Sequence, residues 1–104
     1  IGLYAREPHT NSRGMVHGGL IAALADNAMG LSCVAVLTAQ ERKPEGGLVT
    51  VSMATDFIGA AKLGQWVAFD TSYVKTGRTL CFAQAFITAD GEVIGRADAR
   101  FKVT

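Results

Sequence analysis

The sequence has little charge for its length. Only 18% of its 104 residues are charged, against about a quarter in an average soluble protein, while 49% are hydrophobic. Disordered chains are rich in charge and poor in apolar residues, so this composition argues against disorder. The formal net charge of +1 gives none of the basic surface expected of a protein that binds nucleic acid or an anionic membrane.

Cysteines are also scarce. Cys33 and Cys81 are too few for a disulfide-built scaffold and form no C-x-x-C pair, so we expect a reduced, cytoplasmic setting. Two histidines and two distant cysteines do not supply the converging ligands of a metal site. The sequence contains neither of the common Gly-rich nucleotide-binding loops nor the G-x-S-x-G turn of serine hydrolases. We therefore expect no metal and no redox cofactor.

The length predicts one domain, which we place over residues 1–104. So much apolar surface on a short chain suggests that part of it is hidden against another subunit. The start at Ile1 agrees with a missing N-terminal segment.

The most apolar segment runs from Met15 to Ala39, where Asp26 is the only acidic, lysine or arginine residue. Its apolar residues surround the expected helix, a pattern typical of a membrane span or of the centre of a core. Asp26 and Asn27 lie mid-segment, and an aspartate there costs a few kcal/mol in a membrane. We therefore expect a soluble helix that is wrapped on all sides.

The remainder of the chain predicts strands. After the loop Gln40–Gly47, apolar and polar residues alternate over residues 49–57, which places Thr50 on the same face as Ser52 and Asp56. Further strands are expected at 66–75, 79–89 and 92–103, the last two joined by an Asp90-Gly91 hairpin turn. An extended arm, one helix and four strands predict an α+β fold in which an antiparallel sheet curls around the helix.

His17, Gly18 and Gly19 lie at the expected start of the helix. The first N–H groups of a helix have no partner within it, and the helix dipole favours negative charge there. Such a site can hold a carbonyl oxygen that becomes negative during nucleophilic attack.

Asp26 is the second candidate, because a carboxylate in an apolar helix is costly unless it is paired or used. A purely structural, hydrogen-bonded aspartate is the alternative. Gly18 and Asp26 are eight residues apart, roughly 12 Å along a helix, so one helix cannot direct both groups at the same atom. Two antiparallel copies can, and the chemistry would then require a dimer.

The run H-T-N-S-R-G-M-V-H-G-G-x6-D, then V-T-V, F-I-G-A-A-K-L-G and K-T-G-R-T-L, resembles the hotdog-fold acyl-CoA thioesterases of the phenylacetic-acid-degradation (PaaI) type. The resemblance spans roughly His9 to Lys102. It implies the hotdog fold, hydrolysis of an acyl-CoA or aryl-acyl-CoA, and a homodimer that pairs into a tetramer.

The resemblance also implies roles for particular residues. The Gly18 N–H would polarise the thioester carbonyl, and Asp26 of the other subunit would act as general base or nucleophile. Asn11 would orient the thioester or the water, His17 would shape the helix start, and Thr50 would position water.

Coenzyme A would be held as part of the substrate. Lys75 and Arg78 flank a Thr76-Gly77 turn, and the resemblance implies that this region contacts the phosphates of coenzyme A. An ordinary solvated hairpin is the alternative. Three further residues complete the predicted coenzyme A contacts: Gly19, Lys62 and Gly77.

Two other functions remain open. A hotdog hydratase or dehydratase would pair its aspartate with a histidine a few residues later, and no histidine follows Asp26. A non-catalytic acyl-CoA-binding or sensing module would keep the pocket without needing Asp26. The sequence does not specify the acyl group.

Overall fold

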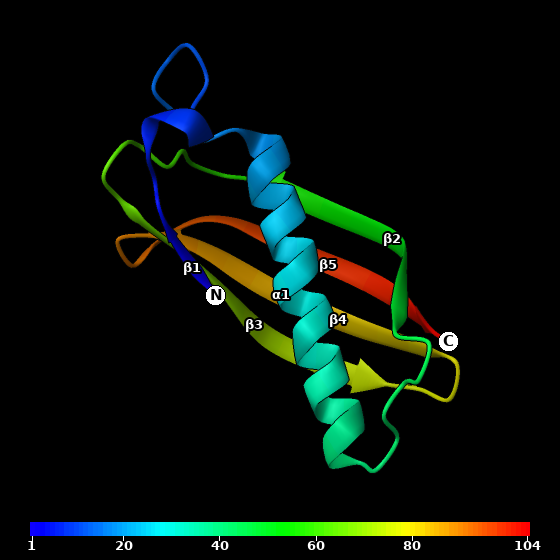
Figure 1. Cartoon of the computed structure of the whole chain (residues 1–104). Helices are drawn as coiled ribbons and strands as arrows, with labels where there is room; N and C mark the ends of the chain where they lie inside the picture. Colours follow the sequence, from blue (N-terminus) through cyan, green and yellow to red (C-terminus); the bar gives the residue numbers. More distant parts are fainter.

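The computed structural model covers all 104 residues and consists of one long helix packed on a five-stranded antiparallel sheet (Figure 1). The sheet has the order β1-β3-β4-β5-β2. The predicted α+β architecture is confirmed, and the predicted arm forms the short edge strand β1. The elements are β1 (Gly2–Tyr4), the 3-10 turn η1 (Glu7–His9), α1 (Gly18–Ala39), β2 (Leu48–Phe57), β3 (Trp66–Thr76), β4 (Leu80–Ala89) and β5 (Glu92–Val103).

Helix α1 lies on the sheet because both surfaces carry suitable side chains. One side of α1 is buried through residues spaced three or four apart, namely Ile21, Ala25, Ala28, Met29, Cys33 and Leu37. Beneath it, β4 and β5 present small buried side chains, namely Ala83, Ala85, Ala97 and Ala99. These alanines leave room for the bulkier residues of the helix, so the core is built between α1 and the middle of the sheet.

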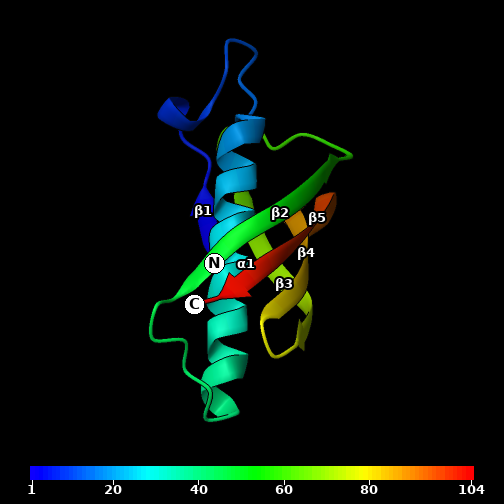
Figure 2. The same cartoon turned by 90° about the vertical axis from the view of Figure 1, so that its right-hand side faces the viewer.

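The opposite side of α1 is uncovered, so the prediction of a helix wrapped on all sides is wrong for the single chain. In Figure 1 no element crosses in front of α1, and Figure 2 shows β4 and β5 together on one side of it. Residues at every fourth position are exposed there, and Leu31 keeps 55% of its surface accessible. We call this row the open stripe; it consists of Gly19, Ala23, Asn27, Leu31 and Ala35. By length and composition α1 could cross a membrane, but six of its side chains are buried in this fold.

The predicted alternation along β2 is wrong at one point. Thr50 pairs with Phe101, whereas Ser52 pairs with Arg100, so Val51 is an extra residue that forms a bulge. Directly opposed residues of antiparallel strands point to the same side, and the buried Phe101 faces α1. The bulge therefore turns Thr50 toward the helix, whereas strict alternation would have placed it on the outer face with Ser52.

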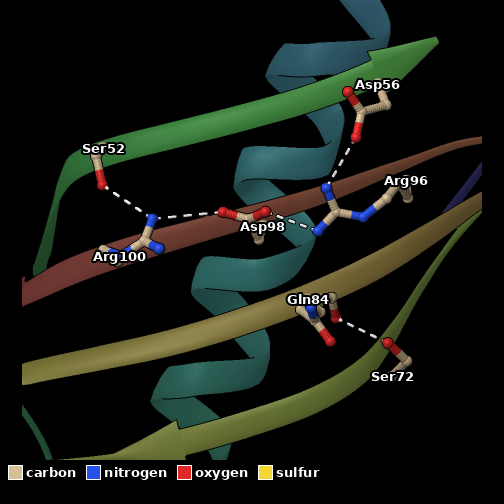
Figure 3. Close-up of polar contacts among 7 residues, drawn as sticks. All are labelled: Ser52, Asp56, Ser72, Gln84, Arg96, Asp98 and Arg100. Carbon is tan, nitrogen blue, oxygen red and sulfur yellow. Dashed lines mark hydrogen bonds and ion pairs between the residues drawn. The ribbon is translucent and has the colours of Figure 1, made fainter.

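The outer face of the sheet carries its own charged network, shown in Figure 3. Arg96 donates to Asp56 at 3.0 Å and to Asp98 at 2.6 Å, and Asp98 also accepts from Arg100 at 3.4 Å. The hydrogen bonds to Asp98 and Asp56 raise the pKa of Arg96. All of these side chains lie on the far side of the sheet from α1, so they belong to a separate surface.

Cys33 and Cys81 are free thiols in the core, between α1 and β4. Burial and the neighbouring Cys81 raise the pKa of Cys33 from 9.0 to about 11. The unfolded chain therefore ionises this thiol at a lower pH than the folded chain does. The contribution of the Cys33 thiol to the free energy of unfolding is therefore present below pH 9 and is lost as the pH rises toward 11.

We expect the free energy of unfolding to fall between about pH 9 and pH 11 by on the order of 2 kcal/mol through Cys33 alone. Urea denaturation of wild type and Cys33→Ala at pH 8, 9.5 and 11 measures this, because lysine and tyrosine ionisation is common to both proteins. Equal pH dependence in the two proteins would contradict the assignment.

Candidate active site

Asp26 and Thr50 form the polar centre of the candidate site. The Thr50 hydroxyl donates a hydrogen bond of 2.7 Å to Oδ1 of Asp26 and joins α1 to β2. Asp26 is half-buried rather than enclosed, because it borders the open stripe. The bond leaves Oδ2 without a partner in the chain, so one carboxylate oxygen is held and the other is free to act.

A surface pocket of about 210 Å³ opens beside this pair. It lies between α1 and β2, and its walls beyond Asp26 and Thr50 are mostly apolar. The other lining residues are Asn27, Gly30, Leu31, Val34, Leu48 and Phe101. A polar pair beside an apolar hollow suits a ligand with a reactive group next to a hydrophobic one.

The start of α1 presents free donors, as predicted. The Ile21 N–H bonds to the His17 carbonyl, but no atom of the chain accepts the N–H of Gly18 or Gly19. His17 contributes only its backbone to the cap, and its side chain is exposed. A Cβ on Gly18 would come within 3.2 Å of Phe57, so this helix start is closely packed on one side.

Asn11 shapes the loop that leads into α1. Its side-chain Oδ1 accepts the N–H of Arg13 at 2.9 Å and that of Met15 at 3.3 Å. The same loop turns at Gly14, which has a φ of 73°. The Asn11 oxygen is thus used locally, and only the amide nitrogen is left to meet a ligand.

The structure does not bring Gly18 and Asp26 together within one chain. Both lie on the same continuous helix, about 12 Å apart along its axis. Thr50 joins Asp26, whereas His17, Gly19 and Asn11 stay with Gly18. The predicted catalytic residues therefore form two groups on each chain.

The predicted coenzyme A contacts are likewise divided. Lys75 and Arg78 lie at the β3–β4 turn, where the Gly77 N–H bonds to the Leu80 carbonyl. Lys62 lies instead beside Met15, which precedes the start of α1. Because α1 has 22 residues and spans about 33 Å, Lys62 lies at the opposite end of the helix from the turn.

Arg42 is a residue that the sequence reasoning missed. It follows the end of α1, and its guanidinium donates to the Gly77 carbonyl at 2.8 Å and to the Arg78 carbonyl at 3.4 Å. Gln40 bonds to Thr76 at 2.9 Å from the same end of α1. The β3–β4 turn is therefore fixed to the helix, a contact between residues 35 positions apart that no local motif signals.

A second hollow, of about 330 Å³, lies on the other side of α1 against β3. Its lining includes Ser32, Phe69, Asp70 and Thr71, but none of the predicted catalytic residues. No group of three or more His, Cys, Asp or Glu side chains is placed to hold a metal ion. The pocket at Asp26 is thus the one that combines a hollow with the predicted chemistry.

Comparison with known proteins shows which family the chain matches. Residues 13–95 match the family described as the thioesterase superfamily. The chain is 33% identical over 101 residues to PA0474 of Pseudomonas aeruginosa, which carries the name of an esterase; the match covers 97% of this chain and 72% of that protein. It is 36% identical over 92 residues to human acyl-coenzyme A thioesterase 13, covering 86% of this chain and 61% of that protein.

Among solved structures, the fold is similar to that of BH2602 from Bacillus halodurans, a crystal structure with CoA. The TM-score is 0.85 at 26% identity, with 99% of this chain and 65% of that chain covered. The long helix, the curled five-stranded sheet and the match over residues 13–95 agree with one another. The chain belongs to the thioesterase superfamily and has the hotdog fold.

Proposed function

We propose that this protein hydrolyses the thioester of an acyl-coenzyme A. The observation that carries the proposal is the Asp26–Thr50 pair at the edge of an apolar pocket. Two proteins named above support the substrate class, since one is an acyl-coenzyme A thioesterase and another was solved with CoA. The PaaI-type resemblance extends the proposal to aryl-acyl groups.

The reaction needs three actions from the protein. The Gly18 N–H donates to the thioester oxygen, which becomes negative as the carbonyl carbon is attacked. The free oxygen of Asp26 either takes a proton from the attacking water or attacks the carbon itself. In both cases the C–S bond breaks and coenzyme A leaves as the thiolate; after direct attack, water hydrolyses the resulting mixed anhydride and frees Asp26. Thr50 holds the other oxygen at 2.7 Å and so orients the carboxylate.

The proposal requires two copies of the chain. When two α1 helices lie antiparallel with their crossing point at residue 22, Gly18 of each copy is level with Asp26 of the other. In that register the two helices overlap over residues 18–26, and the open-stripe residues there, Gly19 and Ala23, are exposed and small, so the helices can approach closely. An interface of this kind has two-fold symmetry and creates two equal sites, and two such dimers would form the tetramer.

We assign the phosphates of coenzyme A to the β3–β4 turn, with Arg42 holding that turn in place. Lys75→Ala/Arg78→Ala should raise KM about tenfold with kcat nearly unchanged, because the phosphates contribute binding far from the reacting carbon. The salt dependence of kcat/KM should also weaken.

Arg6→Ala/Arg13→Ala removes two exposed positive charges near the other end of α1 and serves as the control. An unchanged KM in the Lys75/Arg78 variant, or an equal rise in the control, would favour an ordinary solvated hairpin.

Thiol release from a panel of acyl-CoAs, measured with wild type and Asp26→Asn, separates the three candidate functions. A thioesterase releases coenzyme A and loses this activity in the variant. A hydratase consumes enoyl-CoA without releasing thiol, and for a sensing module wild type and Asp26→Asn bind acyl-CoA equally well.

The free thiols Cys33 and Cys81 suit our further expectation of a reducing compartment such as the cytoplasm.

A further inference from the structure

Gly30 is a glycine in the middle of α1 that the fold itself does not require. A glycine in a helix interior is disfavoured relative to alanine. Its backbone has an ordinary conformation, since its φ lies outside the positive range. A Cβ built there would meet only Phe101, at 3.6 and 3.8 Å, which is ordinary van der Waals contact. The chain could therefore hold an alanine at this position without strain.

Gly30 lies in the middle of the pocket wall. Asp26, Gly30 and Val34 are spaced four apart, so they follow one another along one face of α1. On the facing strand, Thr50 and Leu48 lie two apart and both point toward the helix. The pocket thus has a polar end at Asp26 and Thr50 and an apolar end at Val34 and Leu48, with Gly30 between the two.

The space beside Gly30 is large enough for a sizeable acyl group. An engineered apolar cavity of about 150 Å³ is known to admit benzene. The pocket at Asp26 has about 210 Å³. A methyl group on Gly30 would narrow the passage from the reacting end to the apolar end without touching Asp26 or Thr50.

We propose that Gly30 determines the acyl specificity of this site by keeping the passage open to groups larger than acetyl. This inference rests on the proposed function, because it assumes that the acyl group enters this pocket. It adds a residue that does not take part in the chemistry and that acts only on the size of the substrate.

The test compares wild type, Gly30→Ala and Gly30→Leu on acetyl-, hexanoyl- and phenylacetyl-CoA. We expect Gly30→Ala to lower kcat/KM for the two large thioesters about tenfold or more, since one methyl group in an apolar pocket has an effect of that size. Gly30→Leu should lower it further, and kcat/KM for acetyl-CoA should change less than about twofold in the alanine variant. Gly30→Ala should also raise Tm by about 4 °C, because helix propensity improves.

Thr38→Ala is the matched control, since Thr38 is an exposed residue near the end of α1 and lines neither hollow. It should raise Tm without changing the ratio of hexanoyl to acetyl activity. An unchanged ratio in Gly30→Ala would overturn the inference. So would a lower oligomeric mass of that variant in light scattering, because Gly30 would then serve helix–helix contact.

Calorimetric binding of the same three thioesters distinguishes failure of this inference from failure of the proposed function. If wild type hydrolyses none of them but Gly30→Ala still weakens the binding of hexanoyl-CoA selectively, the pocket assignment stands and the hydrolase proposal falls. If wild type hydrolyses the thioesters but Gly30→Ala changes neither the ratio of hexanoyl to acetyl activity nor the ratio of their binding affinities, the inference alone falls. If wild type neither hydrolyses nor binds these thioesters, both fall.

Discussion

We expect Asp26→Asn to lower the turnover of acyl-CoA hydrolysis by at least about a hundredfold and to leave the fold intact. The amide keeps the size of the side chain, and its oxygen can still accept the Thr50 hydroxyl now bonded at 2.7 Å. What is lost is the negative charge that would take a proton from water or attack the carbonyl carbon. Initial rates of thiol release at saturating substrate measure the effect.

The control for this variant is Asp70→Asn. Asp70 is an exposed carboxylate on β3 that lines the other hollow, so its loss removes an equal charge away from the proposed chemistry. Its turnover should stay within about twofold of wild type, as expected for a surface change. If Asp26→Asn kept more than a tenth of wild-type turnover, Asp26 could not be the catalytic carboxylate.

Most of the fold could be predicted because its signals are local. The strands at 66–75 and 92–103 follow their apolar and β-branched residues, and β4 and β5 are joined at Asp90 and Gly91. Both turn residues have positive φ, 48° and 85°, which is the conformation that an Asp-Gly pair accepts readily. Antiparallel neighbours joined by short turns then determine most of the sheet order.

The prediction failed where pairing between distant strands decides the outcome. The Val51 bulge depends on the register of β2 against β5, which alternation in β2 alone cannot reveal. Thr50 nevertheless lies beside Asp26, because the bulge turns it to the helix side. The water-positioning role that the resemblance implies for Thr50 stays a prediction. The tie from Arg42 to the β3–β4 turn was missed for the same reason, since it joins segments far apart in sequence.

The expectation of a fully wrapped helix failed for another reason. An apolar helix surface predicts that other residues pack against it, but it does not show whether they belong to the same chain or to another subunit. The single chain buries one side of α1 and leaves Leu31 and its neighbours exposed. The same observation motivates the two-copy site, whose most direct test is at Gly18.

Gly18→Pro should reduce turnover about a hundredfold to a thousandfold, the range found when one oxyanion donor is removed. Gly18 is the first residue of α1, the position where a helix tolerates proline best because its N–H has no helical partner. His17 has φ −57° and ψ 131°, a conformation that a residue before proline adopts without strain. The substitution therefore removes the proposed donor and keeps the helix start, but it also adds the bulk of the proline ring beside Phe57.

Gly18→Ala keeps the N–H and controls for the added bulk. Its Cβ lies 3.2 Å from Phe57, so the ring must shift slightly, and we expect a loss of no more than about tenfold. Circular dichroism and melting curves of both variants should show the wild-type fold. Equal losses in the proline and alanine variants would mean that packing against Phe57, rather than the N–H, is what matters.

Mixing the two inactive variants tests whether each site is shared between subunits. A dimer of one Gly18→Pro chain and one Asp26→Asn chain has one site with both changes and one site with neither. After unfolding and refolding an equal mixture, half of the dimers are mixed, so about a quarter of the wild-type rate should return. Recovery of activity from two inactive proteins requires that Gly18 of one copy serve Asp26 of the other. If the mixture stays inactive although mixed dimers have formed, Gly18 and Asp26 of each site would have to come from the same chain. Their separation of about 12 Å along α1 does not allow both to reach one thioester, so the proposed mechanism would then fail.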